Sequence, residues 1–245
     1  MNNQRFALIT GGTKGIGAGV VRMLLHEGYD VLVTYSHDDL AAELFIQEMR
    51  ESFPMSDVFL LKANQSDTLS VQRIVSEIKM RNLSIDCIVC NAGITLRKPI
   101  ELITNEEWLN VMNANVNNNL FLIRDLLSLI KKGSRIIFVG SMMAIKPHAT
   151  SLAYGVSKSA THALALNLVK VFEGTGTTVN VIAPGFVETE WQKSKPEAIR
   201  QSIYNKTAIK RFAAVEEIVD AVSFCLKNPF VNGSVIEVSG GYDFK

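Results

Sequence analysis

Tyr154 and Lys158 are the two residues whose types and spacing best suit proton transfer. In a helix, a separation of four residues places both side chains on one face. A free phenol has a pKa of about 10, too high for easy proton exchange at neutral pH, and a nearby ammonium lowers that pKa by favouring the phenolate. The pair is suited to general acid–base catalysis, although the same spacing also arises by chance on helix surfaces.

Ser141 follows a predicted strand at 135–140 and therefore lies at the carboxyl end of that strand. In open α/β sheets, ligands bind at this edge. A serine hydroxyl there can hydrogen-bond a substrate oxygen, and it can equally cap a turn or a helix. Taken alone, Ser141 leaves both interpretations open.

A glycine-rich segment at 10–17, TGGTKGIG, ends the first predicted strand and leads into a helical pattern. Glycines let backbone N–H groups approach a pyrophosphate, and a helix N-terminus adds partial positive charge. The spacing is G-x-x-x-G-x-G and not the common G-x-G-x-x-G. The segment predicts a dinucleotide site, with an ordinary glycine-rich turn as the alternative.

Short apolar runs alternate with longer helical patterns along the chain, which predicts parallel strands joined by right-handed helical crossovers. Most of the runs are apolar on both faces, as expected for a sheet covered by helices on each side. The expected strands are 5–10, 30–35, 57–62, 85–90, 135–140, 178–183 and 235–238; the expected helices are 16–27, 40–52, 68–81, 106–131, 152–172 and 215–227.

Length and charge restrict the class of protein. The 245 residues suit one α/β domain, 1–245, in which the weakly periodic stretch 188–211 is expected to form a substrate loop or lid. The 25 Lys and Arg nearly balance the 24 Asp and Glu, which argues against nucleic acid or a membrane surface as a partner and favours a small molecule. The polar N-terminus does not resemble a signal peptide, so we expect a cytoplasmic protein.

Cys87 and Cys90 form a C-x-x-C within the expected strand 85–90. Residues three apart on a strand point to opposite faces, so the two thiols should diverge. Core packing is therefore favoured over a redox or zinc role, and no metal site is expected.

The chain resembles the short-chain dehydrogenase/reductase family over nearly its whole length, and most closely its 3-oxoacyl-[acyl-carrier-protein] reductase branch. The glycine segment, Ser141, Tyr154 and Lys158 occur in the family's order and spacing. Further matching pieces are Asn91-Ala92-Gly93, Asn115, Pro184-Gly185 and Thr189. The resemblance implies an α/β fold, a Rossmann-type doubly wound seven-stranded parallel sheet with helices on both faces. It also implies an NADP(H)-dependent oxidoreductase that reduces a ketone to a secondary alcohol, assembled as a homotetramer.

The resemblance also implies roles for the residues of the site. Tyr154 would protonate the carbonyl oxygen, and Lys158 would lower the tyrosine pKa and hold the nicotinamide ribose. Ser141 would polarise the carbonyl, and Asn115 would hold a water that relays protons to Lys158. The expected cofactor contacts are Gly11, Thr13, Lys14, Gly15, Ile16, Gly17, Tyr35, Ser36, Asn64, Gln65, Asn91, Ala92, Gly93, Tyr154, Lys158, Pro184, Gly185, Val187 and Thr189.

Charge placement favours NADP(H), with NAD(H) as the alternative. NAD-preferring relatives usually carry an Asp at the end of the second strand, where this chain has Tyr35. Lys14 and Ser36 can meet a 2′-phosphate. Asp38 and Asp39 argue the other way, but acids here also suit the start of the next helix.

The expected substrate contacts are Ser141, Met143, His148, Tyr154, Phe186 and Trp191, a set that suits an apolar or extended substrate. The resemblance favours a 3-oxoacyl thioester, carried on acyl carrier protein in such relatives, with Lys131 and Lys132 as docking residues. Thr175, where those relatives often have Arg, argues against the carrier protein. The alternatives are a free ketone, sugar, polyol or steroid alcohol as substrate, or a non-catalytic nucleotide-binding sensor or scaffold.

Overall fold

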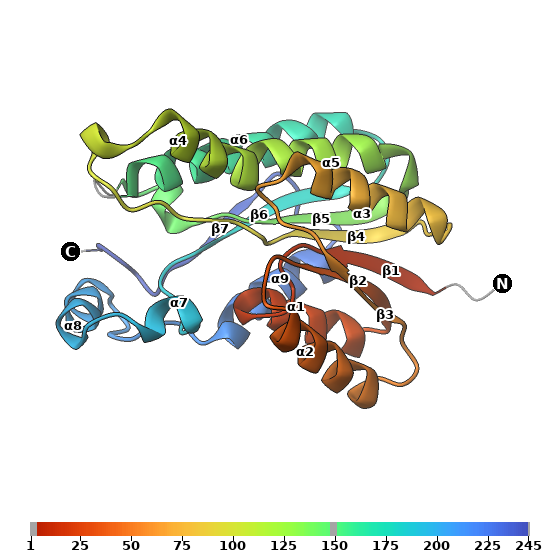
Figure 1. Cartoon of the computed structure of the whole chain (residues 1–245), viewed down its shortest axis with the longest axis horizontal. Coiled ribbons are helices and arrows are strands. Elements are labelled where there is room, and N and C mark those ends of the chain that lie inside the picture. Colours follow the sequence, from red (N-terminus) through yellow and green to blue (C-terminus); the bar gives the residue numbers. More distant parts are fainter. Residues whose placement is uncertain (1–3, 148–150, 245) are drawn as a thin grey trace.

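The structure is a computed structural model that describes residues 4–147 and 151–244. Its centre is a seven-stranded sheet in which every pairing is parallel, in the order β3-β2-β1-β4-β5-β6-β7 (Figure 1). The strands are β1 (Arg5–Ile9), β2 (Tyr29–Tyr35), β3 (Val58–Lys62), β4 (Ile85–Cys90), β5 (Ile130–Val139), β6 (Thr178–Pro184) and β7 (Val235–Val238). The predicted doubly wound Rossmann-type sheet is confirmed.

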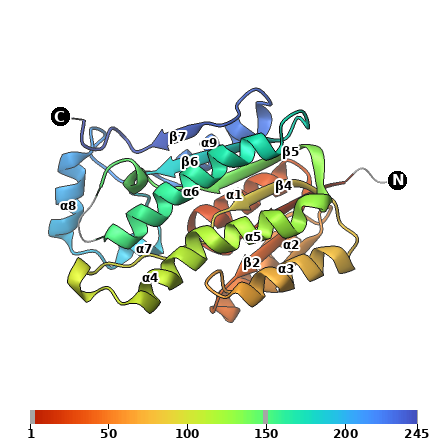
Figure 2. The same cartoon turned by 90° about the horizontal axis from the view of Figure 1, so that it is seen from above.

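Helices cover both faces of this sheet (Figures 1 and 2). The helices α1 (Gly15–His26), α2 (Asp39–Ser52) and α9 (Val215–Lys227) lie on one face. The other face carries α3 (Thr68–Met80), α4 (Asn105–Met112), α5 (Asn118–Leu126) and α6 (Leu152–Val171). Two short helices, α7 (Glu190–Lys193) and α8 (Glu197–Lys206), extend beyond one end of the sheet. This arrangement places one apolar layer above the sheet and another below it.

Alternate residues of each strand supply the two core layers, because successive side chains of a strand point to opposite faces. Ile9 and Val33 pack against α1, α2 and α9, whereas Leu8 and Leu32 pack on the side of α3, α5 and α6. The two cysteines of the C-x-x-C divide in the same way: Cys87 belongs to the first layer and Cys90 to the second. Both thiols are buried, and burial raises the pKa of each to about 12, so core packing is their structural role.

The single helix predicted for 106–131 is wrong in detail. The segment consists of α4, a π-helical turn at Asn113–Asn117, α5 and a 3-10 turn at Leu127–Leu129. Its last two residues, Ile130 and Lys131, begin β5, which is longer than expected because Ile130 already pairs with Ile85 ahead of a register shift. A bulged strand start interrupted by Gly133 carries little of the apolar alternation that predicts a strand.

The stretch 188–211 contains two helices, α7 and α8, where the sequence predicts only an irregular segment. Weak apolar periodicity explains the difference, since α8 buries only Ile203. An ion pair of Arg200 with Glu188, at 2.5 Å between Nη2 and Oε2, ties α8 to the start of the stretch. Its role as a lid over the substrate stays a prediction.

The described residues hold neither a membrane-spanning helix nor a cluster of metal ligands. Among residues 4–147 and 151–244, no helix is long and apolar enough to cross a membrane. Within these ranges, no three His, Cys, Asp or Glu side chains gather as metal ligands would.

Candidate active site

A cavity of about 460 Å³ opens at the carboxyl edge of the sheet. The strand order reverses between β1 and β4, and in open α/β sheets this switch point is where a ligand binds. The segments after six strands, together with the first turns of α6, supply the lining. Of the residues expected to contact cofactor or substrate, those that line this cavity are Gly11, Lys14, Gly15, Ile16, Tyr35, Ser36, Asn64, Gln65, Asn91, Ala92, Gly93, Ser141, Met143, Tyr154, Lys158, Pro184, Gly185, Phe186, Val187, Thr189 and Trp191.

The glycine segment forms a tight turn between β1 and α1. Gly11 and Gly15 have φ angles of +62° and +53°, a backbone region that disfavours side chains. A Cβ on Gly17 would lie 2.3 Å from the carbonyl oxygen of Gly11, so Gly17 serves the packing of helix against turn. Gly17 and Thr13 do not line the cavity. Residue Lys14 gives α1 no side-chain cap, so the first-turn N–H groups lack a capping partner of the usual kind.

Asn91 holds the glycine turn against the end of β4. Its Nδ2 donates to the carbonyl oxygens of Thr10 and Gly11, at 3.0 and 2.8 Å. In return, the Thr10 hydroxyl accepts hydrogen bonds from the backbone N–H groups of Asn91 and Ala92. This reciprocal pairing fixes the two loops that meet at the switch point.

The end of β2 and Lys14 of the glycine turn supply a second group of polar residues. Tyr35, Ser36 and Lys14 line the cavity together. Asp38 caps α2 by accepting a hydrogen bond from the N–H of Ala41, and its carboxylate also forms an ion pair with Lys14. Asp39 pairs with Lys62 at 2.7 Å. Both acids are thus engaged at the helix start, as the sequence suggested.

Ser141, Tyr154 and Lys158 meet in the inner part of the cavity. Ser141 starts a 3-10 turn at Met142–Ala144, and its Oγ accepts a hydrogen bond from the N–H of Met143 at 3.1 Å. Lys158 lies one turn beyond Tyr154 on α6, with Nζ 5.8 Å from the centroid of the tyrosine ring. The ammonium donates to the carbonyl oxygen of Val139 at 2.7 Å. Two hydroxyls and one ammonium therefore share one corner of the cavity.

Burial controls the protonation of these groups. It raises the pKa of Tyr154 above its usual value of 10, while a hydrogen bond with Ser141 and the positive charge of Arg97 act in the opposite direction. Burial lowers the pKa of Lys158 to about 8, which brings proton exchange close to neutral pH. The acidifying interactions on Tyr154 come from Ser141 and Arg97, so its acidification by Lys158 stays a prediction.

Asn115 lies in the π-helical turn between α4 and α5, completely buried. Its side chain donates to the carbonyl of Ile94 and to the Ser157 hydroxyl, and it accepts the N–H of Ile94, all at 2.8–2.9 Å. Its backbone carbonyl accepts hydrogen bonds from Asn119 and Thr161. Asn115 therefore joins the loop after β4 to α6 from behind the cavity.

The far wall of the cavity is the segment after β6. Gly185 is packed so tightly that a Cβ would lie 2.8 Å from Cα of Ser239. Thr189 begins α7 and reaches back to the glycine turn, where a Cβ on Gly15 would lie 3.3 Å from its methyl group. Phe186 stacks on Phe212, with ring centroids 5.7 Å apart. The expected contact His148 lies outside the described residues.

Among the lining residues that the sequence analysis did not predict are two polar ones, Arg97 and Gln192. Arg97 lies in the irregular segment after β4, and Gln192 lies on α7. Each follows a matched motif by a few residues, at positions where the resemblance assigned no role, so composition and spacing gave no signal. The prediction that Lys131 and Lys132 dock a carrier protein at the cavity is wrong. Lys131 lies at the amino end of β5, at the opposite edge from the cavity, and pairs with Asp86 at 2.7 Å.

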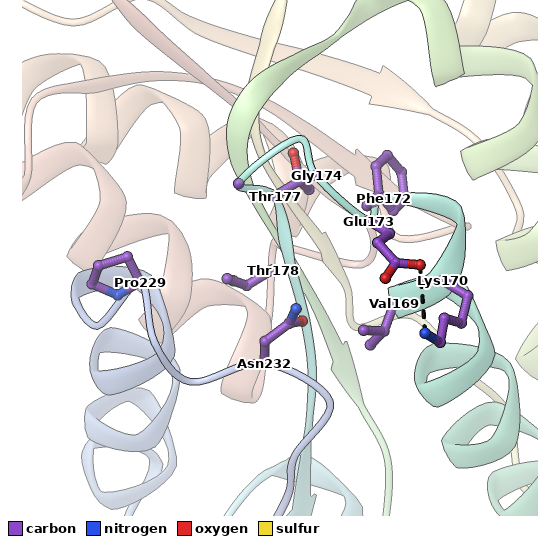
Figure 3. A pocket seen from close by; sticks show the side chains of 10 residues that line it. Val169, Lys170, Phe172, Glu173, Gly174, Thr177, Thr178, Pro229 and Asn232 are labelled. Atoms are coloured by element: carbon purple, nitrogen blue, oxygen red, sulfur yellow. Dashed lines mark hydrogen bonds and ion pairs between the residues drawn. The ribbon is translucent and has the colours of Figure 1, made fainter.

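A second cavity, of about 330 Å³, lies at that opposite edge (Figure 3). It lies between the end of α6, the start of β6 and the segment that leads into β7. The side chains of Lys170 and Glu173 form an ion pair at its rim, with Nζ and Oε2 3.4 Å apart. It is separated from Ser141 by the length of the sheet and plays no part in that site.

Comparison with known proteins identifies the family. The family model described as short chain dehydrogenase matches residues 5–200. The chain belongs to the short chain dehydrogenase family. This short chain dehydrogenase is therefore an oxidoreductase.

Curated relatives of this dehydrogenase carry the name 3-oxoacyl-[acyl-carrier-protein] reductase FabG. The protein from Buchnera aphidicola is 30% identical over 98% of this chain and 97% of its own length. The protein from Staphylococcus aureus is 26% identical over 98% and 99%. Both relatives match over nearly the whole of each chain.

Solved structures agree with the fold. A short-chain dehydrogenase/reductase from Serratia marcescens superposes with a TM-score of 0.91 at 26% identity, covering 98% of each chain. A blue fluorescent protein from a metagenomic library, solved in complex with NADPH, gives a TM-score of 0.91 at 28% identity, covering 98% of this chain and 99% of that one.

Proposed function

We propose that this dehydrogenase reduces a ketone to a secondary alcohol with NADPH, and that the ketone is a 3-oxoacyl compound. The observation that carries the proposal is that the hydroxyls of Ser141 and Tyr154 share one cavity with the glycine turn. A carbonyl oxygen placed there can accept from both hydroxyls, and donors aimed at the developing negative charge stabilise the transition state.

The residues present fit a dinucleotide. Glycines at 11 and 15 leave room for close backbone approach, and the uncapped first turn of α1 offers N–H donors to a pyrophosphate. The cavity continues from this turn past Asn91-Ala92-Gly93 to Tyr154 and the segment 184–189, a path that an extended cofactor can follow. We propose Asn64 and Gln65 at the adenine end and Thr189 at the nicotinamide carboxamide.

NADPH is the proposed form of the cofactor. Support comes from Lys14 in the glycine turn and Ser36 at the end of β2, where a 2′-phosphate would meet a cation and a hydroxyl. Asp38 caps α2 and pairs with Lys14, and Asp39 pairs with Lys62, so both carboxylates already have partners other than a ribose, unlike the acid of an NAD site. The NADPH bound to the metagenomic relative is consistent with this preference.

The mechanism assigns each polar group one task. NADPH, when bound, supplies a hydride to the carbonyl carbon. Tyr154 donates its phenolic proton to the carbonyl oxygen as negative charge develops there, and Ser141 holds the same oxygen by a second hydrogen bond. Lys158 stabilises the resulting phenolate and binds the ribose hydroxyls, and its pKa of about 8 suits the return of a proton to Tyr154.

Asn115 is proposed to complete the proton path by holding a water next to Lys158. A Cβ on Gly93 would lie 2.8 Å from Oδ1 of Asn115 and 3.4 Å from Nζ of Lys158, so both groups border one small space. The backbone carbonyl of Asn115 already accepts two hydrogen bonds. Its Oδ1, which accepts one, is therefore the atom with room for a water.

The names of the curated relatives support a 3-oxoacyl compound as substrate. Docking of acyl carrier protein through Lys131 and Lys132 has no support, because these residues lie at the edge away from the cavity. A thioester presented without its carrier is accordingly the form to test. We also propose a homotetramer, supported by exposed apolar side chains on α4, α5 and α6, namely Leu109, Leu120, Leu152, Val156 and Leu166.

The test is a panel of carbonyl compounds with NADPH and NADH, followed by the loss of reduced-nicotinamide absorbance. The panel contains 3-oxobutanoyl thioesters, simple ketones, sugars and steroid ketones. The proposal expects turnover of a 3-oxo compound with a higher kcat/KM for NADPH than for NADH. Turnover confined to another class, or none with either cofactor, would contradict it. Light scattering after size exclusion tests the tetramer.

A further inference from the structure

Arg97 lies at the wall of the catalytic cavity without a counter-ion. It belongs to the irregular segment after β4 and lines the same cavity as Ser141 and Tyr154. Its charge is close enough to act on the Tyr154 phenol, where it partly offsets the burial that raises the pKa. Across residues 4–147 and 151–244, no carboxylate forms an ion pair with Arg97. A ligand group that meets Arg97 therefore also lies close to the reacting carbonyl.

The neighbouring cation shows a different pattern. Lys98 pairs with Glu107, with Nζ and Oε1 2.5 Å apart, and does not line the cavity. Adjacent residues of one loop thus carry the same charge, one neutralised by a protein carboxylate and the other turned to the ligand space. Because Lys98 is paired and Arg97 is not, Lys98 serves as a control for Arg97.

A second cation, Lys195, does not line the cavity but is affected by the charge of Arg97. Lys195 lies between α7 and α8 and is partly buried. Burial and the positive charge of Arg97 both lower the pKa of Lys195. In the described part of the chain, Lys195 too has no carboxylate partner. Two like charges repel each other, and an anion bound at Arg97 would weaken that repulsion.

Gln192 adds a polar group to the same wall. It lines the cavity and is 9% exposed, and its Oε1 is buried with no hydrogen-bond partner among the described residues. Arg200 fixes the backbone here by donating to the carbonyl oxygen of Gln192 at 3.2 Å. A buried acceptor without a donor is destabilising. Gln192 therefore gives the wall beside Arg97 polar character, although its oxygen is not open to the cavity.

We propose that Arg97 forms an anion-binding subsite beside the reacting carbonyl, so that the substrate is an oxo acid with a free carboxylate. The inference rests on the proposed function and narrows it, because among 3-oxo compounds it selects the acid over the neutral ester or acyl chain. The guanidinium donates two parallel hydrogen bonds to the carboxylate, an arrangement that suits arginine better than lysine.

The experiment compares three compounds that share one 3-oxo group and differ in charge. These are 3-oxobutanoate, its ethyl ester and its N-acetylcysteamine thioester. The enzyme is wild type or Arg97→Gln, with Lys98→Gln as the matched control. The subsite predicts the highest kcat/KM for the acid. It also predicts a loss of about 10- to 100-fold for the acid alone in Arg97→Gln, as expected when a charge-assisted hydrogen bond is removed, and no change in Lys98→Gln.

A binding measurement separates this inference from the proposed function. Calorimetric titration of 3-oxobutanoate into the enzyme with NADP⁺ present involves no turnover. An anion Kd raised about tenfold or more in Arg97→Gln and unchanged in Lys98→Gln supports the subsite even if no 3-oxo compound is reduced, an outcome that refutes the proposed function only. Reduction of the ester or thioester in preference to the acid, or an equal effect of Arg97→Gln on all three compounds, overturns the subsite.

Discussion

The imidazole of His162 accepts a hydrogen bond from the backbone N–H of Ser141, with Nε2 and N 3.3 Å apart. His162 lies on α6 four residues beyond Lys158 and is 8% exposed. The ring fills the space above Gly140, where a Cβ would lie 2.1 Å from Nε2. The histidine thus fixes the backbone that carries the serine hydroxyl, and it does so only as neutral imidazole with Nε2 as acceptor.

His162 is therefore expected to act as a positioning residue. His162→Leu leaves the buried N–H of Ser141 without a partner, which we expect to lower kcat about tenfold while KM for NADPH stays unchanged. His162→Gln offers an amide oxygen and should restore most of kcat. Steady-state kinetics of both variants provide the check, and equal losses in the two would mean that the ring matters for packing only.

The same residue makes stability depend on pH. Burial, and to a smaller extent the charge of Lys158, lower the pKa of His162 from 6.5 to about 4. As the pH falls, His162 therefore takes up a proton at a higher pH in the unfolded chain than in the folded protein. The free energy of unfolding decreases as the pH drops from about 6.5 to about 4, and above 6.5 the contribution of His162 is fully present. The difference between these two pKa values corresponds to roughly 3 kcal/mol in the free energy of unfolding. Urea unfolding of wild type and His162→Gln across this range should show a flatter pH dependence in the variant.

Lys158 is expected to destabilise the fold that it serves. Its pKa is about 8 in the folded protein and 10.5 in the ordinary state, so burial of the charged form is unfavourable at every pH below about 8. Lys158→Met should raise the free energy of unfolding at neutral pH by about 1–3 kcal/mol, and the gain should shrink between about pH 8 and 10.5. Under the proposed mechanism, turnover is lost. Lys170→Met, on the exposed part of the same helix, should leave stability unchanged.

The ion pair of Lys14 with Asp38 sets a prediction on cofactor choice. A 2′-phosphate near Lys14 competes with the Asp38 carboxylate, so Asp38→Asn should lower the Kd of NADPH several-fold and leave the Kd of NADH nearly unchanged. Lys14→Ala should raise the Kd of NADPH. Asp39→Asn, which removes the partner of Lys62, serves as control. Fluorescence titration measures the Kd of both cofactors for wild type and each variant, and equal effects on both cofactors would place the phosphate elsewhere.

The sequence predicts most of the sheet because parallel buried strands are apolar on both faces and end in recognisable turns. Prediction from the sequence fails where a segment has neither an apolar pattern nor a recognisable turn. The π-helical turn around Asn115 and the early start of β5 at Ile130 depend on tertiary pairing, which periodicity does not record. The helices α7 and α8 bury too few residues to show an apolar stripe.

Some residues of the site could be predicted from the sequence and others could not, for the same reason. The glycine turn, Ser141, Tyr154 and Lys158 could be placed because motif and strand end coincide. Arg97, Gln192 and His162 could not, because their significance lies in what they face across the cavity or beneath it. An unpaired charge, an unpartnered amide oxygen and a buried acceptor are properties of the assembled structure.

The central claim is that the Tyr154 hydroxyl transfers the proton in a hydride transfer that occurs in this cavity. Tyr154→Phe tests it most directly, measured in parallel by turnover of the best carbonyl substrate and by titration with NADPH. The account predicts a kcat reduced by about 10²- to 10⁴-fold with the Kd of NADPH changed little. A variant that turns over at nearly the wild-type rate would contradict it.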